Sequence, residues 1–172
     1  YFMGGGGILL FIPRGRIDDW ISIGLANSML FAAFGMVWQG ARAFTRRQPM
    51  LWPVVAPAAL WLGLCALPGY MAFQPLRVVI ASLLVAGLTL LTARELWRDR
   101  SEALPSRTAA VVVLVSFSVF IGIRIPLVGY LPFPMGGGDL SSDWLAIVNL
   151  VVLAHVGGFA FLMVSLTKER RE

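Results

Sequence analysis

Charged side chains are scarce in this sequence of 172 residues: they make up 13% of it, while hydrophobic residues make up 58%. A soluble domain needs about 25% charged residues to cover its surface. The mean hydropathy of +0.80 is also far above what a soluble domain of this size carries. These values exclude a water-soluble protein, so we expect much of the exterior to face lipid.

Residues that carry catalysis or bind metals are nearly absent as well. Cys65 is the only cysteine and lies in an apolar run, which excludes a disulfide framework and a Cys/His metal site. The only lysine, Lys168, ends the last apolar run, so no mid-helix Schiff base is available. No Asp or Glu lies well inside an apolar run, which argues against proton pumps and acidic-ring channels. We therefore predict no catalytic residue, no metal and no cofactor.

Nucleic-acid binding is excluded by the placement of the positive charge. The net charge of +5 and the pI near 10.3 permit such binding in principle. The 14 basic residues, however, lie in short clusters at the ends of apolar runs. A continuous basic face that could follow a line of phosphates is missing.

Five apolar runs are long enough to cross a hydrocarbon core of about 30 Å, which needs roughly 20 residues of helix. They cover residues 20–44, 51–73, 76–97, 108–130 and 144–167. A shorter run at 2–13 is interpreted as the end of a truncated helix. We predict an all-α, polytopic transmembrane helical bundle that forms one domain over residues 1–172, with five complete helices plus the tail of a preceding one.

Aromatic and basic residues predict how the runs cross the membrane. Tryptophan prefers the headgroup level, and of the six tryptophans only Trp61 falls in the middle of a run. The connections on one side carry ten Lys or Arg residues, at 42, 46, 47, 94, 98, 100, 107, 168, 170 and 171. The other side carries four, at 14, 16, 77 and 124. The first side, with the C-terminus, is predicted to be cytoplasmic.

Four polar residues inside the runs are candidates for sensing a ligand: Asn27, Arg124, Asn149 and His155. Arg124 could bind an anion or pair with Asp139 or Asp143, or its side chain could reach the lipid headgroups. His155 could ligate a metal or sense pH, but a hydrogen-bonded interior histidine is the simpler interpretation. The two asparagines could equally serve to hold helices together by hydrogen bonds.

The C-terminal helix shows no break before the chain ends. It continues from the apolar run into the charged residues Thr167, Lys168, Glu169 and Arg170, all compatible with helix. A transmembrane helix that extends into the cytoplasm can couple a membrane sensor to an output domain, so residues 166–172 are interpreted as the start of a signalling helix. The alternative is a simple positively charged anchor.

Several segments resemble one bacterial family. They are residues 14–27 (RGRIDDWISIGLAN), 37–44 (VWQGARAF), 92–98 (TARELWR) and 166–172 (LTKERRE). Together they are similar to the multi-helix membrane region that precedes the GGDEF catalytic domain in many bacterial diguanylate cyclases. The RG-x-I-x-D-W…A-N segment and the W-x-G-x-R-x-F helix end carry the resemblance, because the rest is generic apolar helix.

The resemblance implies a sensory and dimerising input module in the bacterial inner membrane, whose parent protein makes cyclic di-GMP from two GTP. The GGDEF loop, the nucleotide-binding residues and the acidic Mg²⁺ ligands are not among these 172 residues. The expected partners are the lipid bilayer, a second copy of the chain and a cytoplasmic output domain. A transporter or channel subunit, or a structural subunit of a membrane complex, is the alternative.

Overall fold

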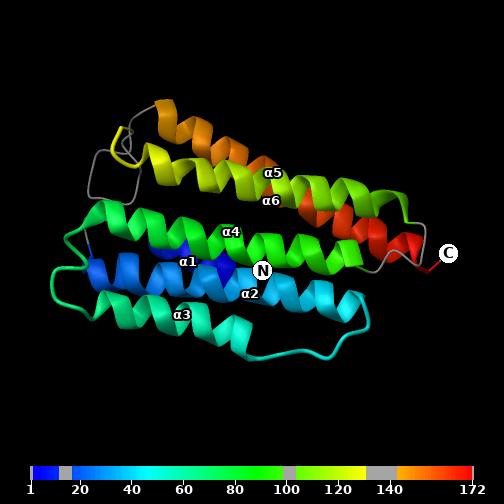
Figure 1. The fold of residues 1–172 in the computed structure, drawn as a ribbon, viewed down its shortest axis with the longest axis horizontal. Coiled ribbons are helices and arrows are strands. Elements are labelled where there is room, and N and C mark those ends of the chain that lie inside the picture. Colours follow the sequence, from blue (N-terminus) through cyan, green and yellow to red (C-terminus); the bar gives the residue numbers. More distant parts are fainter. Residues whose placement is uncertain (1, 12–16, 99–103, 131–142, 172) are drawn as a thin grey trace.

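The computed structural model describes residues 2–11, 17–98, 104–130 and 143–171, with side chains through residue 10 in the first range and from residue 150 onward in the last. All regular elements of this part are helical. They are α1 (Phe2–Phe11), the π-helix η1 (Trp20–Leu25), α2 (Ala26–Phe44), α3 (Trp52–Cys65), α4 (Gln74–Arg98), α5 (Pro105–Leu127) and α6 (Asp143–Glu169). The helices lie nearly side by side in one elongated bundle (Figure 1).

Four described segments are long and apolar enough to cross a membrane. They are Trp20–Phe44, Gln74–Arg98, Pro105–Leu127 and Leu150–Glu169, with lengths of 25, 25, 23 and 20 residues. Large apolar side chains point outward from them: Phe161 on α6 is 70% exposed and Val112 on α5 is 60% exposed. Such residues are stable on the surface when lipid covers them. The all-α bundle of membrane-spanning helices that the sequence predicts is therefore confirmed.

The predicted helix at 51–73 is wrong in its second half. The helix α3 ends at Cys65, so its 14 residues are about 21 Å long and shorter than a membrane span. Pro68 has no N–H to continue the helical hydrogen bonds, and it disfavours helical geometry at the residue before it. Gly69 follows with φ of +79°, which is left-handed backbone. The bundle thus holds four complete spans and one shorter apolar helix in the described residues.

The short N-terminal run forms a helix from Phe2 to Phe11, and its glycines let it approach α2 closely. A Cβ added at Gly7 would lie 2.9 Å from the carbonyl oxygen of Ala26, and one at Gly4 would lie 3.6 Å from the Cβ of Ala33. Small residues at such positions are the usual way for membrane helices to pack. The glycine-rich segment is therefore part of a helix–helix contact.

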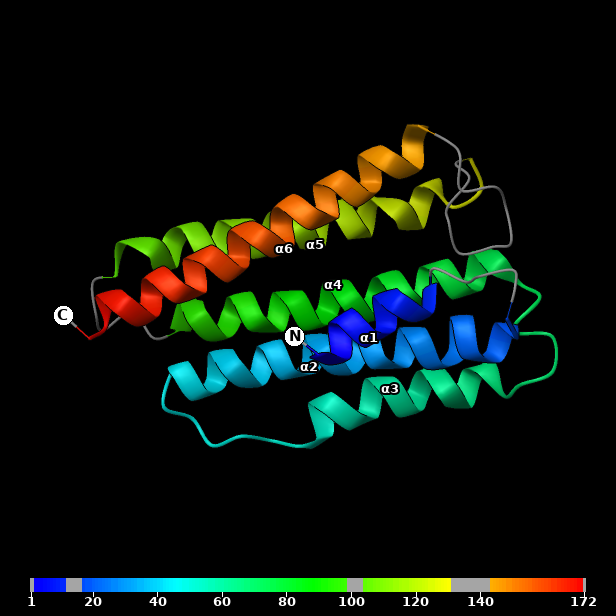
Figure 2. The same cartoon turned by 180° about the vertical axis from the view of Figure 1, so that it is seen from behind.

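The helices pack in the order α3, α2, α4, α5, α6, and α1 lies against the face of α2 seen in Figure 2. The ends of α2, α4 and α6 and the start of α5 gather at one end of the bundle (Figure 1). We call it the basic end, because it carries nine of the described basic residues, at 42, 46, 47, 94, 98, 107, 168, 170 and 171. The described members of the two charge groups, nine at the basic end against Arg77 and Arg124, thus lie at opposite ends.

The core has two clusters. One lies toward the end opposite the basic end and contains Ile23, Phe31, Trp61, Cys65, Tyr70, Ala81, Val85, Phe117 and Ile121. Trp61, the tryptophan expected in the middle of a run, is fully buried there and donates its indole N–H to the carbonyl oxygen of Ile23 at 3.2 Å. The other cluster lies at the basic end and contains Ala41, Ala93, Leu96, Ala110, Leu114 and Leu166.

Candidate functional site

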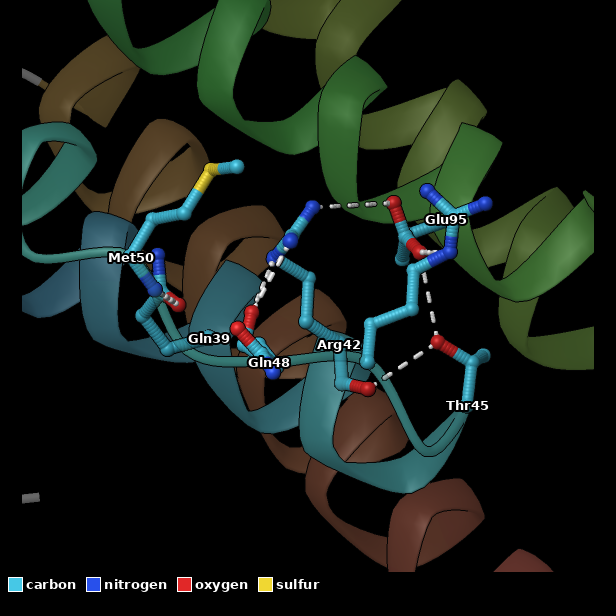
Figure 3. A network of polar contacts seen from close by, with 7 residues as sticks. Gln39, Arg42, Thr45, Gln48, Met50 and Glu95 are labelled. Atoms are coloured by element: carbon cyan, nitrogen blue, oxygen red, sulfur yellow. Dashed lines mark hydrogen bonds and ion pairs between the residues drawn. The ribbon is translucent and has the colours of Figure 1, made fainter.

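A buried carboxylate organises the basic end. Glu95, in the last turn of α4, is 5% exposed and lies between two arginines from the end of α2 and the connection after it (Figure 3). Its Oε1 is 3.1 Å from Nε of Arg47 and accepts a hydrogen bond from Oγ1 of Thr45 at 3.2 Å. Its Oε2 is 3.9 Å from Nη1 of Arg42. A buried carboxylate in this setting is stable because cations and a hydroxyl surround it.

The arginine on α2 also holds the chain that follows. Arg42 is buried and donates from Nε and Nη2 to the carbonyl oxygen of Gln48, at 3.2 and 2.9 Å. Its guanidinium lies 5.7 Å from the ring centre of Trp38. The backbone N–H of Met50 donates to Oε1 of Gln39 at 2.8 Å (Figure 3). The connection from α2 to α3 is thereby fixed against α2.

The end of α2 is shaped by a turn in left-handed backbone. The N–H of Arg47 bonds to the carbonyl oxygen of Arg42 at 2.8 Å, and the N–H of Arg46 bonds to that of Ala43 at 3.1 Å. These two bonds form a Schellman motif, with Arg46 at φ of +56° where glycine is usual. The motif turns the chain so that Arg47 faces Glu95.

None of the predicted site residues belongs to this network. In the sequence, Glu95 is noted only within the segment 92–98, Arg47 only for membrane orientation, and Arg42 for orientation and within the segment 37–44. The signal was present in the segments 37–44 and 92–98, which contain Trp38, Arg42 and Glu95 and which lie against each other in the structure. Their contact joins α2 to α4. A pattern within one apolar run cannot reveal a contact between two helices.

The last turns of α6 reach this same end. Leu166 is 0% exposed within the basic-end cluster. Glu169 accepts hydrogen bonds from Oγ and N of Ser106, at 2.5 and 3.3 Å, so its carboxylate lies at the N-terminus of α5, where negative charge is favourable. Arg170 donates to the carbonyl oxygen of Phe44, and its guanidinium lies 4.7 Å from the Phe44 ring centre. We call these contacts of Phe44, Ser106, Leu166, Glu169 and Arg170 the α6 junction.

Two of the four residues predicted to transmit a signal belong to this junction. Glu169 and Arg170 bond to α5 and α2, whereas Thr167 and Lys168 have exposed side chains. Thr167 donates only to its own helix, to the carbonyl oxygen of Met163 at 2.7 Å. Phe44 and Thr45 are neighbours in the chain, so the α6 junction and the Glu95 network share the last turn of α2.

The predicted sensing residues lie at several levels of the bundle. Asn27 is 1% exposed and donates from Nδ2 to the carbonyl oxygen of Ile23 at 2.7 Å, within its own helical segment. Arg124 is half-buried in the last turn of α5. The backbone of Asn149 lies in α6, but its side chain is outside the described residues, as are the side chains of Asp139 and Asp143.

His155 is a hydrogen-bonded histidine between α5 and α6. Its Nδ1 lies 2.7 Å from the carbonyl oxygen of Val151, and its Nε2 lies 3.1 Å from Oγ of Ser116. Because a carbonyl only accepts, Nδ1 carries the proton in the first contact. The rings of Phe117 and Phe120 lie 5.5 and 6.3 Å away. Within the described residues, no group of three or more His, Cys, Asp or Glu side chains is placed to hold a metal ion.

The comparisons add no relative: no family model, no curated protein and no solved structure matches this chain. The class of the protein therefore comes from the fold alone. It is a membrane protein built as an all-α bundle, with a buried ionic network and the end of α6 joined to α2 and α5 at the basic end.

Proposed function

We propose that this chain is the sensory input module of a bacterial inner-membrane signalling protein. It acts as a homodimer with the basic end in the cytoplasm, and it passes its signal through the end of α6 to a diguanylate cyclase domain of the GGDEF type. The proposal joins the resemblance of the sequence to one structural observation, the α6 junction. The end of α6 contacts the end of α2 and the start of α5 there, so a change in either helix reaches the chain that leaves the membrane.

The packing of α6 supports a mechanism in which its C-terminal end is either joined to α2 and α5 or released from them. Among the described helices α6 packs mainly on α5, and it diverges from α4 toward its N-terminal end (Figures 1 and 2). At its C-terminal end Leu166 is fully buried and Arg170 reaches Phe44 on α2. A signal that changes the tilt of α6 or α5 would shift the population between a joined and a released α6 end. Release would alter how two output domains meet across the dimer.

The experiment measures cyclic di-GMP in cells that produce the full-length protein with Ser106→Ala or Arg170→Ala. Ser106→Ala removes one side-chain hydrogen bond of the α6 junction, worth about 1 kcal/mol, and so shifts a two-state equilibrium about fivefold. Arg170→Ala removes a hydrogen bond together with the guanidinium–ring contact, so its shift should be at least as large. We expect both variants to change the nucleotide level in the same direction, because both release the same helix end.

The control is Val112→Ala, which shortens a side chain on the exposed face of α5 and leaves the junction intact. Its nucleotide level should equal that of the parent protein when the amounts in the membrane are matched. Unchanged levels in both junction variants, or shifts in opposite directions, would contradict a relay through this junction.

A further inference from the structure

A buried cation also lies at the end opposite the basic end. Arg77 is in the first turn of α4, directly after the turn at 66–73 that follows α3, and it is 5% exposed. Its Nε and Nη1 atoms are buried and have no hydrogen-bond partner among the described residues. No described carboxylate forms an ion pair with it. This differs from Arg42, which is similarly buried but has Glu95 beside it.

Elementary electrostatics makes this position unusual. Burying a guanidinium costs several kcal/mol unless an anion or several acceptors stand beside it. The start of α4 does not help, because a helix N-terminus has partial positive charge and attracts anions. Arg77 and the first turn of α4 therefore act in the same sense, and both favour an anion at this place.

The surroundings of Arg77 supply a neutral donor. The phenol oxygen of Tyr70 is buried and has no partner among the described residues. Burial is the largest effect on the pKa of Tyr70 and raises it, and Cys65 raises it further. The charge of Arg77 acts in the opposite direction, and the resulting pKa is about 12. The phenol therefore keeps its proton at neutral pH and can donate it. The ring centre of Trp61 lies 5.9 Å from that of Tyr70, so an aromatic wall adjoins the polar groups.

We infer that Arg77 and Tyr70 form a binding site for an oxyanion, a carboxylate or phosphate group, between the turn at 66–73 and the start of α4. A guanidinium binds such groups through charge-assisted hydrogen bonds, and the phenol of Tyr70 can add a further one. The oxyanion can belong to a small soluble molecule or to a lipid headgroup. This site differs from all four predicted sensing residues, and the inference stands whether or not a cyclase follows the chain.

The test measures thermal unfolding of the purified protein in dodecyl maltoside micelles, which contain no phosphate or carboxylate. In one arm sodium phosphate or sodium acetate replaces sodium chloride at constant ionic strength. In the other arm no such anion is added and phosphatidylglycerol is mixed into the micelles. An oxyanion at about ten times its dissociation constant should raise the unfolding midpoint by about 3 °C.

Variants assign the effect to the site. Arg77→Met should abolish the rise, and without added anion it should unfold at the same temperature as the parent or higher, because an unpaired buried charge is gone. The matched control is Arg94→Met, an exposed arginine of the same helix, which should keep the full rise. Tyr70→Phe should raise the anion concentration at half-saturation about fivefold, because one hydrogen bond is lost.

Each result decides the inference. A rise that needs Arg77 and occurs with soluble phosphate or acetate identifies a soluble oxyanion, and one that occurs only with phosphatidylglycerol identifies a lipid phosphate. The inference is overturned if neither arm gives a rise that depends on Arg77. If Arg77→Met does not fold, Tyr70→Phe decides, because an unchanged half-saturation overturns the inference too. No cyclase activity enters the measurement, so its failure is separate from failure of the proposed function.

Discussion

Replacing Glu95 with alanine is expected to lower the free energy of unfolding by about 3–5 kcal/mol, because it removes one side of a buried ion pair. Arg42 would then remain buried with no carboxylate beside it, and Thr45 and Arg47 would lose their common acceptor. The measurement is unfolding in mixed micelles with increasing denaturing detergent, followed by tryptophan fluorescence.

Two further variants separate charge from packing. The double variant Glu95→Ala with Arg42→Met should recover much of the loss, because both members of the pair are then absent. Glu169→Gln should cost less than Glu95→Ala, because Glu169 is only half-buried and keeps an oxygen for Ser106. A loss under about 1 kcal/mol for Glu95→Ala would show that the pair behaves like an exposed salt bridge.

Replacing Gly35 with alanine is expected to force α3 away from α2. A Cβ at Gly35 would lie 2.8 Å from the Cα of Val54 and also against the backbone of Pro53. Backbone atoms cannot turn aside as a flexible side chain can, so the helices must separate. We expect a loss of about 2–3 kcal/mol or more, the range for overpacking a tight contact. The same detergent unfolding measures it.

Gly40, on the same helix, provides the matched control. A Cβ there meets nothing within 4 Å. Gly40→Ala should therefore raise stability by about 0.5–1 kcal/mol, because alanine favours helix more than glycine does. Equal effects of the two substitutions would mean that α3 does not rest on Gly35.

Much of the fold follows from the sequence. Apolar length predicts five spans, four of which the described helices match, and the split of Lys and Arg predicts which helix ends gather together. Trp61, the one tryptophan in the middle of a run, is fully buried, which its position in the run does not by itself predict. The error at 51–73 arose because apolar composition continues through Pro68 and Gly69, whereas helix geometry does not. Hydropathy reports what lipid tolerates, and proline and glycine decide where the backbone turns.

The candidate site was harder to predict, for a physical reason. Glu95 and Arg47 carry the same sequence signal as any charge near the end of a membrane helix, and burial distinguishes them only once α2 and α4 pack. Arg77 was counted for orientation in the same way. His155 was easier, because a single histidine in an apolar run needs hydrogen-bond partners, and Ser116 and Val151 provide them.

The central claim is that the α6 junction delivers a signal to an output domain in the same polypeptide. The most direct test is to sequence the gene past the codon for Glu172. The account predicts an open reading frame that continues the helix of α6 through a short linker into a GGDEF domain. A stop codon directly after Glu172, or a continuation with no output domain, would contradict the account and favour a transporter or a subunit of a membrane complex.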